Sequence, residues 1–153
     1  MVVTLHFTDD GWICELVDIE AAFLEGYNKG LQFMEWPPGL LELGFATKEQ
    51  IKLTCLQMLR CIYGNVEAAL RFYTTYAQYL IKELGMTRSL TDSCLFFMKD
   101  ESGKVVLMAS RHVDDTQIAG RPEWIKFFKD KVKERFNIKE LVRLQKHLGI
   151  KND

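Results

Sequence analysis

Three aspartates are placed where carboxylates can do chemistry together. Asp114 and Asp115 are adjacent and directly follow the apolar residues 105–113, and Asp18 ends a second apolar segment, residues 14–17. Because Asp is common in turns, an ordinary hairpin turn is the alternative for the adjacent pair. If the two segments are neighbouring strands, three carboxylates meet at one edge of a sheet. Such hard oxygen ligands favour Mg²⁺, with Mn²⁺ as the second candidate, and two such ions can drive attack by a hydroxyl on a phosphate.

The elements that must position these carboxylates follow from hydrophobic periodicity and turn residues. We expect strands near residues 4–7, 12–17, 31–35, 51–56, 94–98, 105–113 and 116–119. We expect one long helix over residues 66–84, with Asn65 as its N-cap, and a second that has Pro122 at its first position. Strands interleaved with two long helices predict an α+β fold of the split βαβ type, in which helices pack on one face of an antiparallel sheet.

Each long helix has an apolar stripe at spacings of three and four. The stripe expected for the first helix is Val66, Leu70, Tyr73, Ala77, Leu80 and Leu84. The stripe expected for the second is Ile125, Phe128, Val132 and Phe136. These residues are the predicted contacts between the helices and the sheet.

The composition is that of one globular domain: 153 residues, 48% hydrophobic and 27% charged. No apolar run approaches the roughly 18 residues that span a bilayer, and the first residues lack the pattern of a signal peptide. We therefore expect no membrane partner and a cytoplasmic or nuclear protein that is not secreted. The net charge is −1, but residues 121–151 carry ten Lys and Arg against four Asp and Glu. This segment is either a nucleic-acid-binding surface or a solvated helix.

Eight segments carry a family resemblance, and they lie in that family's order along the chain. They are VDIEAAFLEG at 17–26, MEWPPG at 34–39, IYG at 62–64, LGMTRS at 84–89, DSCLF at 92–96, HVDD at 112–115, FNIKEL at 136–141 and LGI at 148–150. The chain resembles the palm of the reverse transcriptases of copia-type long-terminal-repeat retrotransposons over nearly its whole length. The family has Y-V-D-D where this chain has HVDD.

The resemblance implies metal-dependent transfer of a nucleotide from a deoxynucleoside triphosphate to a primer paired with a template. It makes Asp18, Asp114 and Asp115 the catalytic metal ligands. It also implies substrate contacts, of which one rejects a ribose 2′-hydroxyl and a pair grips the primer end. The implied substrate-binding residues are Phe23 for the 2′-hydroxyl, Glu67, His112, and Leu148 with Gly149 for the primer. For Phe23 the alternative is plain core packing.

The chain also departs from the family's pattern. Val66 and Glu67 replace a Lys and a Gln, which makes the site less favourable to a polyanion, and His112 replaces a Tyr. Arg111 stands where the family has an apolar residue. Because Arg111 and Asp115 are four residues apart, they share a face if the strand continues, and the guanidinium would then pair with the carboxylate in competition with a metal ion. The alternative is an Arg111 that points into solvent.

We expect residues 1–153 to form a single palm domain, with residues 141–153 beginning a primer-grip-like hairpin. The N-terminal part of the fingers, the thumb and an RNase H domain are expected to be absent, so other polymerase domains or an oligomer partner would have to complete an enzyme. An RNA-directed DNA polymerase palm that is inactive in isolation is the first hypothesis. The second is a retrotransposon-derived, non-catalytic module for nucleic-acid binding or assembly, and the third is a palm-like cyclase or a split βαβ domain without a site.

Overall fold

The computed structural model describes the backbone of residues 11–141, 146–147 and 150–151, and side chains over residues 11–139. The chain divides into two compact units. The sheet unit comprises Met1–Ala22 and Thr75–Asp153, and the ribbon unit comprises Phe23–Thr74.

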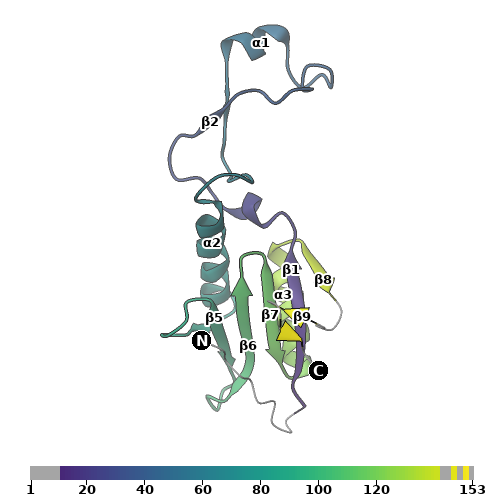
Figure 1. The fold of residues 1–153 in the computed structure, drawn as a ribbon. Helices are drawn as coiled ribbons and strands as arrows, with labels where there is room; N and C mark the ends of the chain where they lie inside the picture. The colour runs from purple at the N-terminus through teal and green to yellow at the C-terminus, as the bar shows by residue number, and fades with distance from the viewer. Residues whose placement is uncertain (1–10, 142–145, 148–149, 152–153) are drawn as a thin grey trace. The chain divides into compact units, whose positions relative to one another are not determined.

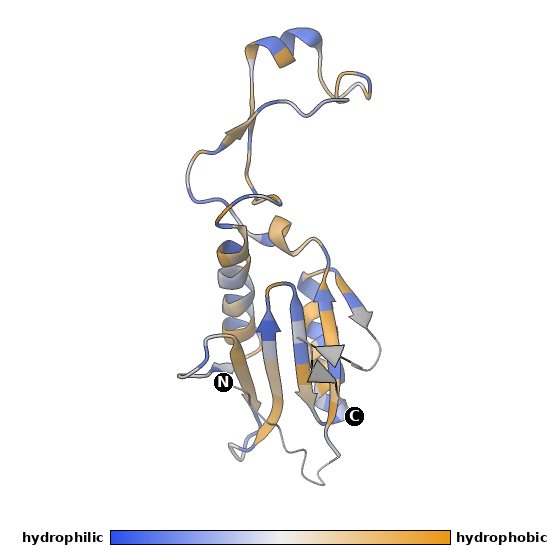
Figure 2. Cartoon of the chain, viewed as in Figure 1, coloured by the Kyte–Doolittle hydropathy of each residue, from blue (hydrophilic) through white to orange (hydrophobic). Residues whose placement is uncertain are grey.

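The sheet unit is built on a six-stranded sheet with the order β4-β5-β6-β7-β1-β8, in which every pair of neighbours is antiparallel (Figure 1). Its strands are β1 (Ile13–Ile19), β4 (Thr87–Arg88), β5 (Leu95–Lys99), β6 (Val105–His112), β7 (Asp115–Gly120) and β8 (Ile138–Leu141). Figure 2 shows hydrophobic colour along most of β5 and β6, which gives way to hydrophilic colour where β6 meets its turn. Two further strands, β9 (Lys146–His147) and β10 (Ile150–Lys151), pair antiparallel with each other.

Alternation along the strands separates two faces of the sheet. Val17, Thr116 and Ile118 point to one face and are fully buried. We call this the helix face, because Glu15 on it pairs with Lys129 of helix α3 at 2.8 Å, and Thr116 contacts Tyr76 of helix α2. The opposite face carries half-buried residues, and we call it the carboxylate face: Leu16, Asp18, Ser110, Asp115 and Gln117.

The two long helices are α2 (Ala68–Lys82) and α3 (Pro122–Arg135), and α3 lies behind the sheet in Figure 1. Pro122 stands in the first turn of α3, where its missing N–H is not needed. The stripe predicted for this helix is confirmed, because all four of its residues are at most 2% exposed: Ile125, Phe128, Val132 and Phe136.

The ribbon unit contains all but the first residue of the 3₁₀ helix η1 (Ala22–Glu25). It also contains helix α1 (Lys48–Leu53) and the strand pair β2 (Phe33–Met34) and β3 (Leu56–Gln57). Asn28 ties this antiparallel ribbon together: its side-chain amide donates to the carbonyls of Met58 and Arg60 at 2.9 and 3.1 Å. Several large apolar side chains of this unit are well exposed: Leu31, Phe33, Leu43, Phe45, Leu53 and Leu59.

The predicted α+β fold, with an antiparallel sheet and helices on one face, is confirmed. Two element predictions are wrong. Residues 48–53 form a helix where a strand was expected from residue 51, because Thr47 and Gln50 make a reciprocal capping box. The stripe expected for α2 is displaced at its start, where Val66 is 99% exposed and Phe72 is fully buried instead. The strand expected at residues 4–7 lies outside the described residues.

None of the helices described over residues 11–141 is both long and apolar enough to cross a bilayer.

Gly120 of β7 lies close against the backbone of β6, and it provides a test of the sheet. A Cβ at this position would lie 2.6 Å from the carbonyl oxygen of Val106 and 3.0 Å from the Cα of Leu107. Because both neighbours are backbone atoms, we expect Gly120→Ala to lower the free energy of unfolding by about 1–3 kcal/mol in denaturant titration. The control Ser110→Ala, on the neighbouring strand, should stay within about 0.5 kcal/mol. Equal unfolding midpoints for the two variants would contradict this packing.

Candidate functional site

Strand register brings the three aspartates to one end of the sheet. Asp18 on β1 is the direct Cα partner of Asp115 on β7. His112 pairs with Asp115 to close the β6–β7 hairpin, so only Val113 and Asp114 form its turn. The carbonyl of Asp114 accepts from the amide of Ile19 at 3.2 Å, which ties the turn to β1. The convergence expected from the sequence is therefore found in the backbone.

A row of four residues crosses the carboxylate face at this end. Successive pairings join His112 to Asp115, Asp115 to Asp18, and Asp18 to Lys139 on β8. Direct cross-strand partners have Cβ atoms about 4.5–5.5 Å apart, so opposite charges support each other and like charges repel. Lys139 was not singled out from the sequence, because only the pairing of β8 with β1 places it beside a carboxylate.

The neighbouring carboxylates affect the protonation of Asp18. The pKa of Asp18 is raised, first by partial burial and then by the negative charges of Asp114 and Asp115, while Lys139 opposes the shift. Two carboxylates directly opposite in a sheet are unfavourable by themselves. A bound cation between them would offset this repulsion.

Backbone strain is concentrated at the same end of the sheet. Val113 has φ of 55° and Ala21 has φ of 52°, and they are the two non-glycine residues with positive φ in the described part of the chain. For the β-branched Val113 this conformation is a genuine outlier. Strained residues persist only where the surrounding structure over-determines them, and they cluster at functional sites. Val113 directly precedes Asp114, and Ala21 follows Asp18 by three residues.

The chemistry of the donors fits a hard divalent cation, although the side chains do not form a ready-made cage. Among the residues whose side chains are described, no three His, Cys, Asp or Glu groups are arranged to hold a metal ion. Mg²⁺ is commonly held by only one or two carboxylates and completes its shell with water and substrate phosphates. Asp18 and Asp115, as cross-strand partners, could supply such a pair, and Asp114 adds its charge beside them.

Arg111 does not share a face with Asp115, so the premise of the expected ion pair is wrong. The strand ends at His112, and Arg111 is the partner of Thr116 on the helix face. Arg111 is only 5% exposed, so the alternative of a side chain that points into solvent is also wrong. The guanidinium donates to the carbonyl of Val113. It also lies over the ring of Tyr76, with the Cζ atom of Arg111 5.4 Å from the ring centroid.

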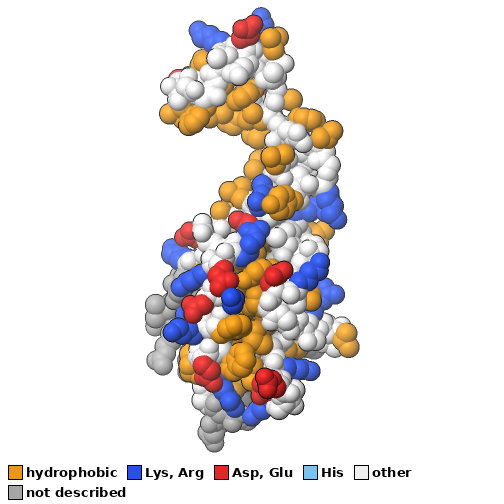
Figure 3. Space-filling model, turned by 180° about the vertical axis from the view of Figure 1, so that it is seen from behind, with side chains coloured by type: hydrophobic (Ala, Val, Ile, Leu, Met, Phe, Trp, Pro, Cys, Tyr) orange, Lys and Arg blue, Asp and Glu red, His pale blue; other side chains and the backbone are white. Residues whose placement is uncertain are grey.

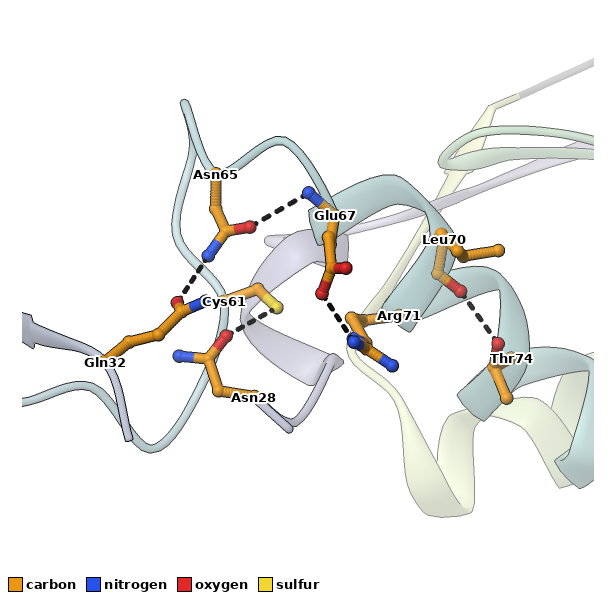
Figure 4. Close-up of polar contacts among 8 residues, drawn as sticks. All are labelled: Asn28, Gln32, Cys61, Asn65, Glu67, Leu70, Arg71 and Thr74. Atoms are coloured by element: carbon orange, nitrogen blue, oxygen red, sulfur yellow. Dashed lines mark hydrogen bonds and ion pairs between the residues drawn. The ribbon is translucent and has the colours of Figure 1, made fainter. Parts of the chain in front are cut away.

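Two predicted substrate residues lie in the ribbon unit. Phe23 is half-buried and packs edge-on against Tyr63, with ring centroids 4.8 Å apart. Glu67 forms an ion pair with Arg71, one turn further along the chain (Figure 4). The backbone N–H of Glu67 donates to the side-chain oxygen of Asn65. The carboxylate of Glu67 is thus partly neutralised within its own unit. Leu148 and Gly149 lie outside the described residues, and the roles of all four in binding substrate stay predictions.

The basic C-terminal segment does not form a uniform surface on α3. Lys129 is engaged by Glu15, and Lys131 pairs with Glu134 at 2.9 Å. Figure 3, which turns the molecule to show the side behind the sheet of Figure 1, shows Lys and Arg intermixed with Asp and Glu. Because α3 packs on the helix face, its lysines lie on the other side of the sheet from Asp18.

The electrostatic coupling of the aspartates can be measured directly. We expect Asp115→Asn to lower the pKa of Asp18, because a negative neighbour is removed, in a carboxyl-carbon NMR titration. The control is Asp130→Asn, at an exposed position of α3, which should leave the pKa of Asp18 unchanged. The pKa of Asp18 is higher in the folded chain than in the unfolded chain. At a pH above the folded-state pKa, the ionised carboxylate therefore destabilises the fold, and at a pH below the unfolded-state pKa this destabilisation is absent. Asp18→Asn should therefore stabilise the protein more at pH 7 than near pH 3. An Asp18 pKa indifferent to Asp115→Asn would contradict the proximity.

Comparison with known proteins places these features in a family. The family described as "Reverse transcriptase (RNA-dependent DNA polymerase)" matches residues 2–152. The chain is 29% identical over 143 residues to the "Retrovirus-related Pol polyprotein from transposon RE2" of Arabidopsis thaliana. The matched segment covers 93% of this chain and 9% of that protein. It is 26% identical over 139 residues to the "Retrovirus-related Pol polyprotein from transposon TNT 1-94" of Nicotiana tabacum, covering 90% and 10%.

The chain thus spans about a tenth of the length of these relatives. No solved structure matches it. The family match covers nearly every residue, and the relatives are copia-type retrotransposon polyproteins, as the ordered motifs predicted. The chain therefore belongs to the reverse transcriptase (RNA-dependent DNA polymerase) family of copia-type retrotransposons.

Proposed function

We propose that this chain is the catalytic palm of an RNA-directed DNA polymerase, in which Asp18, Asp114 and Asp115 hold Mg²⁺ or, alternatively, Mn²⁺. The observation that carries the proposal is the cross-strand pairing of Asp18 with Asp115 beside a strained two-residue turn. The bound cation would supply charge stabilisation and activation of the primer hydroxyl.

The chain's own residues supply positioning. The antiparallel register fixes the separation of Asp18 and Asp115, and the bond from the Ile19 amide to the Asp114 carbonyl holds the turn against β1. Catalysis of phosphoryl transfer depends mostly on such positioning and on charge stabilisation. We further propose that Phe23 excludes a ribose 2′-hydroxyl and that His112 and Glu67 contact the substrates. Leu148 and Gly149 are proposed to contact the primer end.

A second candidate is a non-catalytic module for assembly or nucleic-acid binding, and the ribbon unit favours it. Its exposed apolar side chains are of the kind that bury against a partner: Leu31, Phe33, Leu43, Phe45, Leu53 and Leu59. The replacements Val66 and Glu67 also make this unit less attractive to a polyanion than the family's pattern. Template-dependent primer extension by the chain would exclude this second candidate.

We expect the isolated chain not to extend a primer at a measurable rate, even with Mg²⁺. Effective molarity comes from holding the primer end and the triphosphate in line, and the carboxylates alone do not provide that. The measurement is extension of a labelled primer–template by the purified chain, beside the matched variant Asp114→Asn. Template-dependent extension that disappears in Asp114→Asn would overturn this expectation and would establish the palm as sufficient for catalysis.

We expect nucleic-acid binding to depend on the carboxylate face more than on α3. Lys139 stands in the row with Asp18, whereas Lys126 is exposed on α3, behind the sheet. Lys139→Glu should weaken binding of a primer–template duplex and reduce the salt slope by about one, because one phosphate contact is lost. The control Lys126→Glu should leave the slope unchanged. A fluorescence titration at several salt concentrations tests this, and a larger effect of Lys126→Glu would contradict it.

A further inference from the structure

Arg111, which stands where the resemblance implies an apolar residue, reaches the strained turn at Val113. Its side chain is buried on the helix face beneath the hairpin tip. We propose that Arg111 is a positioning residue whose guanidinium fixes the Val113–Asp114 turn and so sets where Asp114 and Asp115 project. The effect on metal binding rests on the proposed function, but the effect on the turn does not.

The contacts of Arg111 explain how a buried charge is accommodated. A buried cation requires hydrogen-bond acceptors or an aromatic face, since desolvation is otherwise expensive. The guanidinium donates to the carbonyl of Val113 and lies over the face of Tyr76. Tyr76 is fully buried, its pKa is raised to about 12 mainly by that burial, and its hydroxyl accepts from Thr116 at 3.3 Å. Helix α2 is thereby connected to the turn through Arg111.

The turn is held from two sides. Arg111 binds the carbonyl of Val113, and the amide of Ile19 on β1 donates to the carbonyl of Asp114. A valine with φ of 55° returns to a relaxed conformation unless such contacts oppose it. A charge-assisted hydrogen bond to the strained residue's own carbonyl is a direct means of opposing that relaxation.

The experiment compares amide hydrogen exchange in the wild-type chain, Arg111→Met and Arg111→Lys. Methionine keeps much of the apolar length and removes the donors, while lysine keeps the charge. The Ile19 amide reports on the turn, and the Phe136 amide, which donates to Val132 in the last turn of α3, reports on global stability. We expect Arg111→Met to lower protection of the Ile19 amide about tenfold more than that of Phe136, the size of one charge-assisted hydrogen bond. Arg111→Lys should recover part of the loss.

A double-mutant comparison tests whether the effect passes through the strained residue. Glycine adopts positive φ without strain, so in the Val113→Gly background the Ile19 loss caused by Arg111→Met should fall below about threefold. If Arg111→Met does not fold, Arg111→Lys against wild type gives the same comparison, with a loss of about threefold. Equal loss at Ile19 and Phe136, or no loss at either, would overturn the proposal.

Mn²⁺ affinity, followed by electron paramagnetic resonance, gives the second readout. We expect Arg111→Met to weaken Mn²⁺ binding about tenfold, as other supporting residues of metal sites do, and Arg111→Lys to weaken it less. A wild-type chain that binds no Mn²⁺ would defeat the proposed catalytic function, while the exchange data would still decide whether Arg111 positions the turn. Unchanged Mn²⁺ affinity in Arg111→Met, with wild-type binding intact, would overturn the link from the turn to the carboxylates.

Discussion

The antiparallel register between β1 and β7 is the constraint on which the rest of the site depends. It makes Asp18 and Asp115 direct partners, and a shift of one residue would send one of them to the helix face. The same register places Val17 and Thr116 together in the core, where both are fully buried. Burial of apolar side chains on one face therefore fixes the position of the acidic side chains on the other.

That constraint is unfavourable at the hairpin tip, whereas further along the strand pair it buries side chains in the core. Like charges face each other at Asp18 and Asp115, and Val113 is held in a conformation that disfavours valine. The surrounding structure must hold this strain, and the buried side chains of β1, β6 and β7 on the helix face are the contacts that do so. A metal ion between the carboxylates would relieve the repulsion, so the empty and bound states should differ mainly at the tip.

Much of this architecture could be predicted from the sequence. The apolar strands, the helix beginning at Pro122 and the aspartates at strand ends follow from periodicity and position alone. The errors have local causes. Residues near 51 are apolar enough for a strand, but the capping box of Thr47 and Gln50 selects a helix. The stripe predicted for α2 fails at its start because Val66 precedes the first helical residue, Ala68, and Leu70 in the first turn is exposed.

The site was predicted less completely than the fold. Spacing placed Arg111 and Asp115 on one face, since it could not show that a two-residue turn intervenes. Lys139 escaped notice because its partner, Asp18, lies 121 positions away in the chain and only strand order joins them. Long-range pairing of this kind is set by the tertiary fold, and no local pattern encodes it.

The central claim is that Asp18, Asp114 and Asp115 together bind a divalent cation. A crystal structure of the chain soaked with Mn²⁺, with the ion located by its anomalous scattering, tests it most directly. The account predicts an ion at the end of β1 and β7, with Asp18 and Asp115 among its ligands and Asp114 beside them. Mn²⁺ found only elsewhere, or carboxylates that remain apart at saturating Mn²⁺, would contradict the account.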